Sequence, residues 1–284
     1  MGTMPIGIHT ICYESGMVDA VDPAFLPLDV TADPQPERRE MAHMLNFWRQ
    51  GLHRKYSATG LLSPSFTRKT GWSGSQFIDF IRNNPGYDVW FVTPFPFWFY
   101  FSYNIWEHGD CCHPGLCEVS SQVFKAANVK VDLFDFPRST LNTLLFCNFW
   151  AGTPKFWDRF MPFVEHILMH AEKIGRVHEQ VIYGGEQKTT YFPFIAERLF
   201  TTFLVMQQGI KTRFIKYELS HMLKMSVYKI HTLMLREWAP MIDKWDAEGT
   251  YNGDRRAVFK GLTKLGILSL LQDQPTFLRM VLDV

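Results

Sequence analysis

The sequence predicts an α/β domain built on a mainly parallel central sheet with flanking helices. Short apolar segments rich in β-branched and aromatic residues occur at residues 6–13, 60–66 and 87–93, which is typical of buried strands. Amphipathic segments with helical periodicity separate them, at residues 37–52 and 73–84. The order strand, helix, strand, helix, strand indicates that neighbouring strands run parallel.

The elements between these segments are predicted from turn residues and caps. Residues 22–36 are rich in proline and aspartate, so we expect a long loop without a regular element. Loops of this length in a compact domain are usually functional or mobile. Ser73 is a good N-cap, and Gln76 completes a capping box with it.

The second half of the chain mixes further strands with longer helices. We expect helices at residues 99–107 and 117–127 around a loop at 108–115, strands at 129–134 and 144–150, and helices at 153–173 and 191–206. Gly184 and Gly185 mark a turn. From Gly209 onward the chain is expected to be largely helical, with breaks at residues 249–253 and at Pro275. Residues 1–207 would form one domain, and residues 208–284 a helical extension packed on it.

Composition limits the possible classes of function. The chain has 284 residues, of which 46% are hydrophobic and 20% charged, so it can bury a large core. Its 29 basic and 28 acidic residues give a net charge of +1. A general affinity for nucleic acid is not indicated, because phosphate binding requires a basic excess. A local basic patch remains compatible with this balance.

Five cysteines and the absence of a secretory signal favour a cytoplasmic protein with reduced thiols. No apolar window reaches the roughly 18 residues of a membrane span. Residues 211–229 mix Lys and Arg with large apolar residues. This helix would either lie on an anionic membrane surface or pack on the domain with a solvated basic face.

The helix predicted at residues 191–206 is the segment around which the candidate site is organised. It is apolar on two faces, and Glu197 lies on the face that also carries Thr201. Such a helix is normally buried, and a buried carboxylate needs a partner or a function. Glu197 therefore either forms a structural ion pair, with Arg198 or another cation, or projects into an active-site cleft.

Several familiar motifs are absent or incomplete. There is no Gly-x-Ser-x-Gly elbow, P-loop or dinucleotide fingerprint. His166 and His170 stand one helical turn apart, but Ile167 occupies the position where a metalloprotease has glutamate, so an ordinary helix face is expected. The cysteines and histidines of residues 106–117 do not have the spacing of zinc ligands.

Three segments in this order resemble glycosyltransferases of bacterial cell-surface polysaccharide clusters. They are NFWRQGLHRKYSATGLLSPSFTRKTG (residues 46–71), LFCNFWAGTPKFWDRFMPFVEHI (145–167) and YFPFIAERLFTTFL (191–204). The family has a Gly-Leu-Ser-Pro stretch or a related basic one, then an Asn-containing strand before an aromatic helix, and finally a Glu-Arg-Leu helix. The resemblance covers about residues 6–204 and implies a GT-A-like fold, Rossmann-like in its sheet.

The resemblance also implies a nucleotide-sugar donor, UDP-linked, and a surface-polysaccharide or lipid-linked glycan acceptor. It assigns candidate residues to three roles. The catalytic carboxylate would be Glu197, with Glu107 as its rival. Donor and phosphate contacts would be Ser63, Arg68, Lys69 and Arg198, and sugar or acceptor contacts would be Trp106, His113, Asn148 and Trp150.

The chemistry of sugar transfer fits these residue types. A leaving diphosphate needs cations or amide dipoles where its charge develops, and an acceptor hydroxyl needs a carboxylate base. The Asp-x-Asp pair that holds Mn²⁺ or Mg²⁺ in most metal-dependent GT-A enzymes is absent. The nearest pair, Asp132 and Asp135, has the wrong spacing for two ligands from a strand. Metal dependence is therefore left open.

Two other functions are alternatives to this one. The chain would then be either a non-catalytic glycan-binding protein on the same fold or a glycosyltransferase that acts on modified bases in DNA. The first predicts sugar binding that is indifferent to Glu197→Gln. The second is disfavoured by the near-neutral charge.

Overall fold

The computed structural model describes residues 5–33, 35, 37–183, 187–225 and 228–270. The chain divides into two compact units, each assembled from segments that are distant in sequence. Unit 1 comprises Met1–Phe95, Leu145–Ile174 and Phe192–Ile215. Unit 2 comprises Pro96–Leu144, Gly175–Tyr191 and Lys216–Val284. This division differs from the expected boundary after residue 207.

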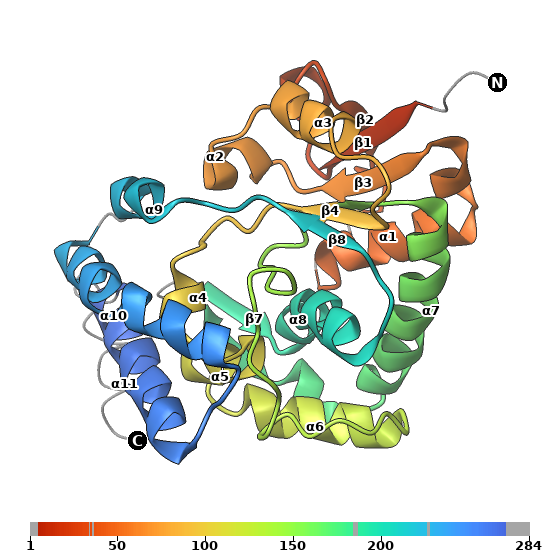
Figure 1. Ribbon diagram of the computed structural model, residues 1–284. Helices are drawn as coiled ribbons and strands as arrows, with labels where there is room; N and C mark the ends of the chain where they lie inside the picture. The colour runs from red at the N-terminus through yellow and green to blue at the C-terminus, as the bar shows by residue number, and fades with distance from the viewer. Residues whose placement is uncertain (1–4, 34, 36, 184–186, 226–227, 271–284) are drawn as a thin grey trace. The chain divides into compact units, whose positions relative to one another are not determined.

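Unit 1 contains a six-stranded, mostly parallel sheet, which confirms the predicted α/β class (Figure 1). Its strands, in the order β2-β1-β3-β5-β4-β8, are β2 Leu26–Asp29, β1 Ile6–Cys12, β3 Ala58–Leu62, β5 Trp150–Gly152, β4 Val89–Phe91 and β8 Thr212–Phe214. The predicted strands near residues 6–13, 60–66 and 87–93 are all present.

Strand β2 corrects the prediction that residues 22–36 hold no regular element. It pairs in parallel with β1, with Thr10 opposite Pro27. Because β2 is the last strand at one side of the sheet, Pro27 is tolerated there although it lacks a backbone donor.

Strand β5 runs antiparallel to its neighbours β3 and β4. The strand predicted at residues 144–150 starts only at Trp150, because Cys147 and Asn148 adopt left-handed backbone angles, with φ of 65° and 51°. Since β5 is antiparallel, the residues that precede it lie at the carboxyl ends of β3 and β4.

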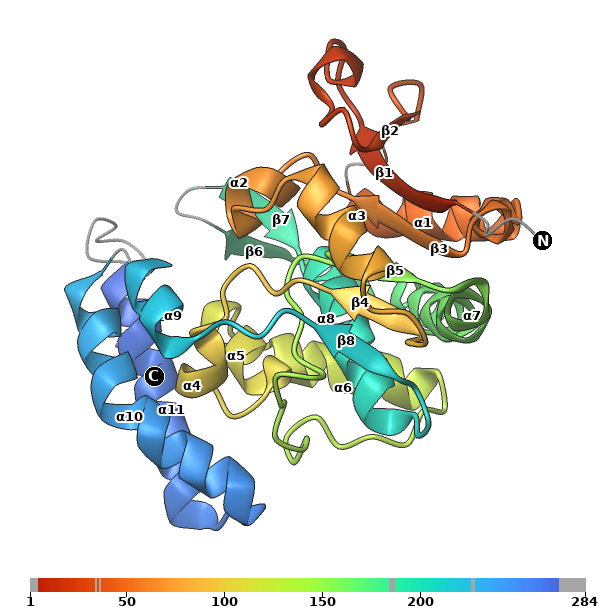
Figure 2. The ribbon, with the colours of Figure 1, turned by 45° about the horizontal axis from the view of Figure 1, so that its top comes forward.

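Helices cover both faces of this sheet. They are α1 Arg39–Arg49, α2 Phe66–Thr70, α3 Gly74–Arg82, α7 Pro154–Ala171 and α8 Phe192–Met206, with short 3₁₀ turns at Val18–Ala20 and Leu52–Lys55. Helix α1 packs beside α7, and α7 beside α8. Helix α3 packs against β1 on the opposite face (Figure 2). The capping box of Ser73 and Gln76 is present at the start of α3.

Helix α8 is buried on nearly every side, as its two apolar faces predicted. Phe200 packs on Phe91 of the sheet and on Phe160 of α7. Its neighbour Phe203 contacts Phe160 as well. The side chain of Glu197 remains 24% exposed. The hydrophobic effect therefore fixes this helix in the core, and Glu197 is the acidic group that it carries to the edge of that core.

Unit 2 is mainly helical. It comprises α4 Trp98–Phe101, α5 Ile105–Cys112, α6 Leu116–Ala126, α9 Leu219–Met225, α10 Lys229–Glu248 and α11 Gly253–Leu270, a 3₁₀ turn at Gly175–His178, and a hairpin of β6 Gln180–Tyr183 and β7 Gln187–Thr190. The predicted break at residues 249–253 separates α10 from α11. Gly184, Gly185 and Pro275 lie outside the described residues.

Three local predictions in this part of the chain are wrong. Helix α5 begins after Asn104, which accepts hydrogen bonds from two backbone N–H groups, and continues to Cys112 through the expected loop. Residues 129–134 form no strand. Residues 211–229 do not form one basic helix, because Thr212–Phe214 is strand β8 of unit 1. Among the described residues, no helix is both long and apolar enough to cross a membrane.

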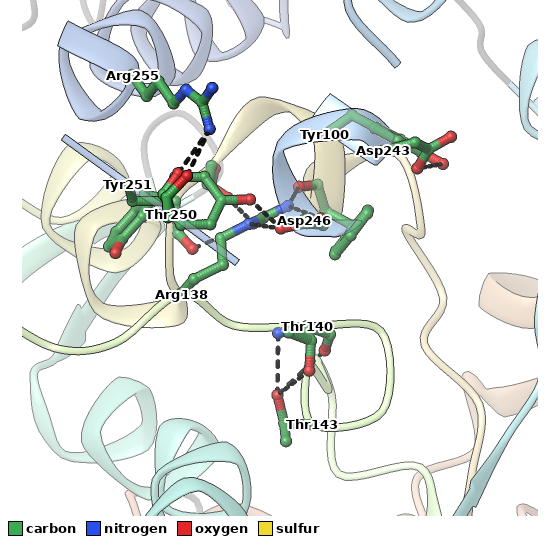
Figure 3. A network of polar contacts seen from close by, with 12 residues as sticks. Tyr100, Arg138, Thr140, Thr143, Asp243, Asp246, Thr250, Tyr251 and Arg255 are labelled. Carbon is green, nitrogen blue, oxygen red and sulfur yellow. Dashed lines mark hydrogen bonds and ion pairs between the residues drawn. The ribbon is translucent and has the colours of Figure 1, made fainter. Parts of the chain in front are cut away.

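A buried arginine organises the polar contacts within unit 2 (Figure 3). The guanidinium of Arg138 donates to the carbonyls of Phe99 and Ser102, at 2.8 and 2.7 Å, and pairs with Asp246 at 3.2 Å. It also lies over the rings of Phe99 and Phe259. Asp246 accepts a further hydrogen bond from Tyr251. These contacts tie the chain near α4 to both long helices, α10 and α11.

A buried histidine in β1 makes the stability of unit 1 depend on pH. Burial lowers the pKa of His9 from 6.5 to about 4. Because the unfolded chain binds this proton first, stability is full above pH 6.5 and falls as the pH drops. We expect a loss of about 2 kcal/mol by pH 5 from this group.

Urea unfolding of wild type and His9→Phe between pH 7.5 and 5 measures this effect. Phenylalanine keeps an aromatic ring against Phe47 and Tyr56 but does not titrate, so the variant should lose less stability on acidification. His53 and His231 also have lowered pKa values from burial, so a residual slope remains. An unchanged slope in His9→Phe would contradict the prediction, and His221→Gln at an exposed site is the control.

Candidate functional site

The candidate site lies at the end of the sheet of unit 1 that is formed by the carboxyl ends of its parallel strands. Strand β1 pairs with β2 on one side and with β3 on the other, so the strand order reverses at this point. Ligands of open α/β sheets bind outside the carboxyl ends of the strands at such a switch. Helix α2 follows β3 there, and residues 147–149 precede the antiparallel β5 at the same edge.

Cys147 connects the two charged groups of this edge. The ammonium of Lys69, on α2, donates to Cys147 Sγ at 3.3 Å. The backbone N–H of Cys147 donates to Glu197 Oε1, on α8, at 2.7 Å. The basic turn and the acidic helix, 128 residues apart by their numbers 69 and 197, are thus held against the same residue. One cation contacts the thiol of Cys147, and one carboxylate contacts its backbone N–H.

The thiol itself is not poised as a nucleophile. Burial is the main cause that raises the pKa of Cys147 to about 12, and the negative charge of Glu197 is the second. The ammonium of Lys69 lowers this pKa and so opposes both. Thiolate, not thiol, attacks electrophiles. We therefore assign to Cys147 the positioning of Lys69 and Glu197, and not covalent catalysis.

Only one of the two carboxylate oxygens of Glu197 accepts the hydrogen bond from Cys147. Oε1 accepts the backbone N–H, whereas Oε2 lies 3.7 Å from a guanidinium nitrogen of Arg198. Arg198 is only 2% exposed and donates to the carbonyl of Phe194 at 2.8 Å. The guanidinium of Arg198, which was expected to face a phosphate, is enclosed in the core and bonds the backbone of α8.

The segment that carries Cys147 is strained and anchored. Left-handed angles in residues other than glycine cost about 1–3 kcal/mol each, and Cys147 and Asn148 both adopt them. The backbone N–H of Leu145 donates to Thr201 Oγ1 at 3.1 Å, one helical turn beyond Glu197. Asn148 is 7% exposed, and its Oδ1 is buried without a hydrogen-bond partner. Strain and an unsatisfied amide in one short segment are typical of functional sites.

The remaining sequence-predicted residues of unit 1 are divided between surface and core. Arg68 is exposed on α2 beside Lys69. Ser63 is buried and shares a hydrogen bond with Ser65 at 2.7 Å. Trp150 is fully buried, with Phe200 stacked on it at 5.7 Å. Its ring cannot contact a sugar in this arrangement, so its role in the structure is packing.

Tyr13, which directly follows β1, adds a polar group to the same edge. Burial raises the pKa of its phenol, the charge of Glu40 raises it further, and the charge of Lys69 lowers it. Lys69 therefore acts electrostatically on Tyr13 as well as on Cys147. The phenol is 39% exposed, so it is accessible to a ligand at this edge.

The rival carboxylate and the suggested metal ligands belong to unit 2. Glu107 is ion-paired with Arg256 at 3.0 Å, and Asp135 pairs with the same guanidinium. Asp132 accepts the backbone N–H groups of Phe134 and Asp135, which closes a turn. In this structure Asp132 closes a turn, and Asp135 pairs with Arg256. No group of three or more possible metal-ligating side chains occurs among the described residues.

The two aromatic residues suggested as acceptor contacts also lie in unit 2. Trp106 is fully buried in α5, edge-on to Phe124 of α6 at 5.7 Å. His113 is 8% exposed and forms the C-cap of α5. Both positions are explained by the packing of α5 and its neighbours.

A cavity of about 250 Å³ in unit 1 lies elsewhere, between α1 and α7. Its charged lining consists of ion pairs, Arg38 with Glu172 and Arg49 with Glu165, each at 2.7 Å. The two arginines that line this cavity are therefore both ion-paired with glutamates of α7 or of its C-terminal end.

Comparisons with protein families, with characterised proteins and with solved structures give no match to this chain. The site therefore rests on its geometry. Sequence reasoning singled out Lys69, Glu197 and Asn148 but missed Cys147 and Thr201. Glu197 and Thr201 lie on the same face of α8, and this is the sequence feature from which the binding of residues 145–147 to that face could have been inferred.

Proposed function

We propose that this chain is a glycosyltransferase that moves a sugar from a nucleotide-sugar donor to a hydroxyl of a glycan acceptor. The observation that carries the proposal is that Lys69 and Glu197 both contact Cys147, at the carboxyl ends of the parallel strands. The proposed fold type is GT-A-like, within the α/β class described above. The resemblance of the three sequence segments supports the same reaction.

Each charged group has a role that the reaction requires. When the glycosidic bond to the donor breaks, negative charge grows on the diphosphate, and the ammonium of Lys69 stabilises it. The acceptor hydroxyl gives its proton to Glu197, whose Oε2 is not used in the bond to Cys147. Cys147 contacts both groups, Lys69 through its thiol and Glu197 through its backbone N–H.

A panel of nucleotide sugars tests the proposal. The purified chain is incubated with each donor and a mixture of simple glycan acceptors, and release of free nucleotide and protection against thermal unfolding are measured. We expect one donor, UDP-linked, to give both signals. A panel that yields neither nucleotide release nor protection overturns the proposal.

Two neighbouring residues of α2 provide a matched control. Lys69→Met removes the ammonium at Cys147 and should weaken donor binding more than Arg68→Met, which removes the exposed charge beside it on the same helix. Sugar binding without nucleotide release, unaffected by Glu197→Gln, would instead indicate a glycan-binding protein. Transfer of a sugar to modified bases in DNA, in place of glycans, would identify the third candidate.

A further inference from the structure

Two histidines on α7 form a pair that the proposed function does not use. His166 is exposed and His170 is half-buried, one helical turn further along. Their ring centroids are 4.8 Å apart, with the ring planes at 64°. Residues four apart lie on the same face of a helix, so both imidazoles project from one side of α7.

The hydrogen bond of His170 determines which of its nitrogens can bind a ligand. Nδ1 of His170 lies 2.8 Å from the carbonyl oxygen of His166. A carbonyl only accepts, so Nδ1 carries the proton and Nε2 presents the lone pair. A hydrogen bond from one ring nitrogen to a carbonyl is the arrangement that fixes the orientation and tautomer of metal-bound histidines.

We propose that His166 and His170 form a chelating site for a divalent late transition-metal ion such as Ni²⁺, Cu²⁺ or Zn²⁺. Neutral imidazole is a preferred ligand of all three ions. The folded helix holds the two rings at the separation that lets one ion bind both. Two protein ligands leave the other coordination positions to water, so this is an open surface site and not a structural metal centre.

The folded helix is essential to the affinity. Once one imidazole has bound the ion, the second is held nearby at high effective concentration, which strengthens binding about a hundredfold. The ion therefore binds native α7 more tightly than the unfolded chain and stabilises the fold. This inference is independent of sugar transfer, because it uses neither Lys69 nor Glu197.

Isothermal titration of the untagged, full-length protein with NiCl₂ tests the site. Ni²⁺ is preferred to Cu²⁺ as the probe, because Cu²⁺ oxidises thiols and the chain has five cysteines. His166→Gln and His170→Gln should each weaken the tightest Ni²⁺ site about a hundredfold. His221→Gln, at an exposed position of α9, is the matched control and should bind as wild type does.

Urea unfolding with and without Ni²⁺ gives a second readout. The ion should raise the unfolding midpoint of the wild type and of His221→Gln, but not that of His170→Gln. The proposal is overturned if His170→Gln binds Ni²⁺ as tightly as the wild type. It is equally overturned if His221→Gln loses the tightest site, since the site would then lie elsewhere.

Discussion

Replacing Glu197 by glutamine is expected to lower the rate of sugar transfer about a hundredfold to ten-thousandfold while the fold persists. The amide oxygen of glutamine can still accept the N–H of Cys147, which now bonds Glu197 Oε1 at 2.7 Å. It cannot accept a proton from the acceptor hydroxyl. Nucleotide release in the presence and absence of acceptor, with the donor identified by the panel, measures the loss.

Two further variants separate catalysis from structure. Glu107→Gln in unit 2 removes the rival carboxylate, which is ion-paired with Arg256, and should leave most of the transfer rate intact. Glu197→Ala removes the acceptor for Cys147 as well, so it should lower both the rate and the unfolding midpoint. If Glu107→Gln abolished transfer and Glu197→Gln did not, the catalytic assignment would have to be reversed.

Replacing Arg138 by methionine is expected to reduce the free energy of unfolding by about 3–5 kcal/mol, because it removes one partner of a buried ion pair. Its side chain is 6% exposed, and Asp246 opposite is 20% exposed. The variant also leaves the carbonyls of Phe99, Ser102 and Tyr103 without the donor that they share. Urea unfolding followed by circular dichroism at neutral pH measures the loss.

Arg255→Met is the control for this effect. Arg255 lies in α11 of the same unit and pairs with Glu248, whose side chain is 38% exposed. Exposed pairs contribute about 0–1 kcal/mol. Arg255 is 24% exposed and also donates to the carbonyl of Thr250, so its loss should cost somewhat more than this but less than the loss of Arg138. Equal losses in the two variants would show that burial of Arg138 is not what makes it important.

Local sequence patterns were sufficient wherever one segment decides its own structure. Ser73 and Gln76 form a capping box because both partners lie within four residues. The apolar faces around Glu197 placed α8 in the core, because burial of large side chains dominates its free energy. Asn104 was not predicted as a cap, because residues 99–107 were expected to form a single helix. The structure has two helices there, and Asn104 caps the second.

Patterns failed where distant segments meet. Pro27 was evidence against a strand in the sequence. In the structure β2 pairs only with β1 and is an edge strand, where a proline is tolerated. Residues 144–149 are apolar enough for a strand, but Glu197 and Thr201 bind their backbone N–H groups and hold them in another conformation. Arg198 and Glu197 are neighbours in the sequence, and no local pattern shows that their side chains differ in burial. In the structure the side chain of Arg198 is 2% exposed and that of Glu197 is 24% exposed.

The sequence by itself determined the α/β class, the burial of α8 and the two charged residues, Lys69 and Glu197, that the proposed reaction needs. These follow from periodicity and composition, which act over a few residues at a time. Only the tertiary structure decided that both charges meet at Cys147, because the antiparallel β5 brings residues 147–149 to the edge where α2 begins. Contacts between segments so far apart in the chain depend on the topology of the sheet, and no local pattern encodes it.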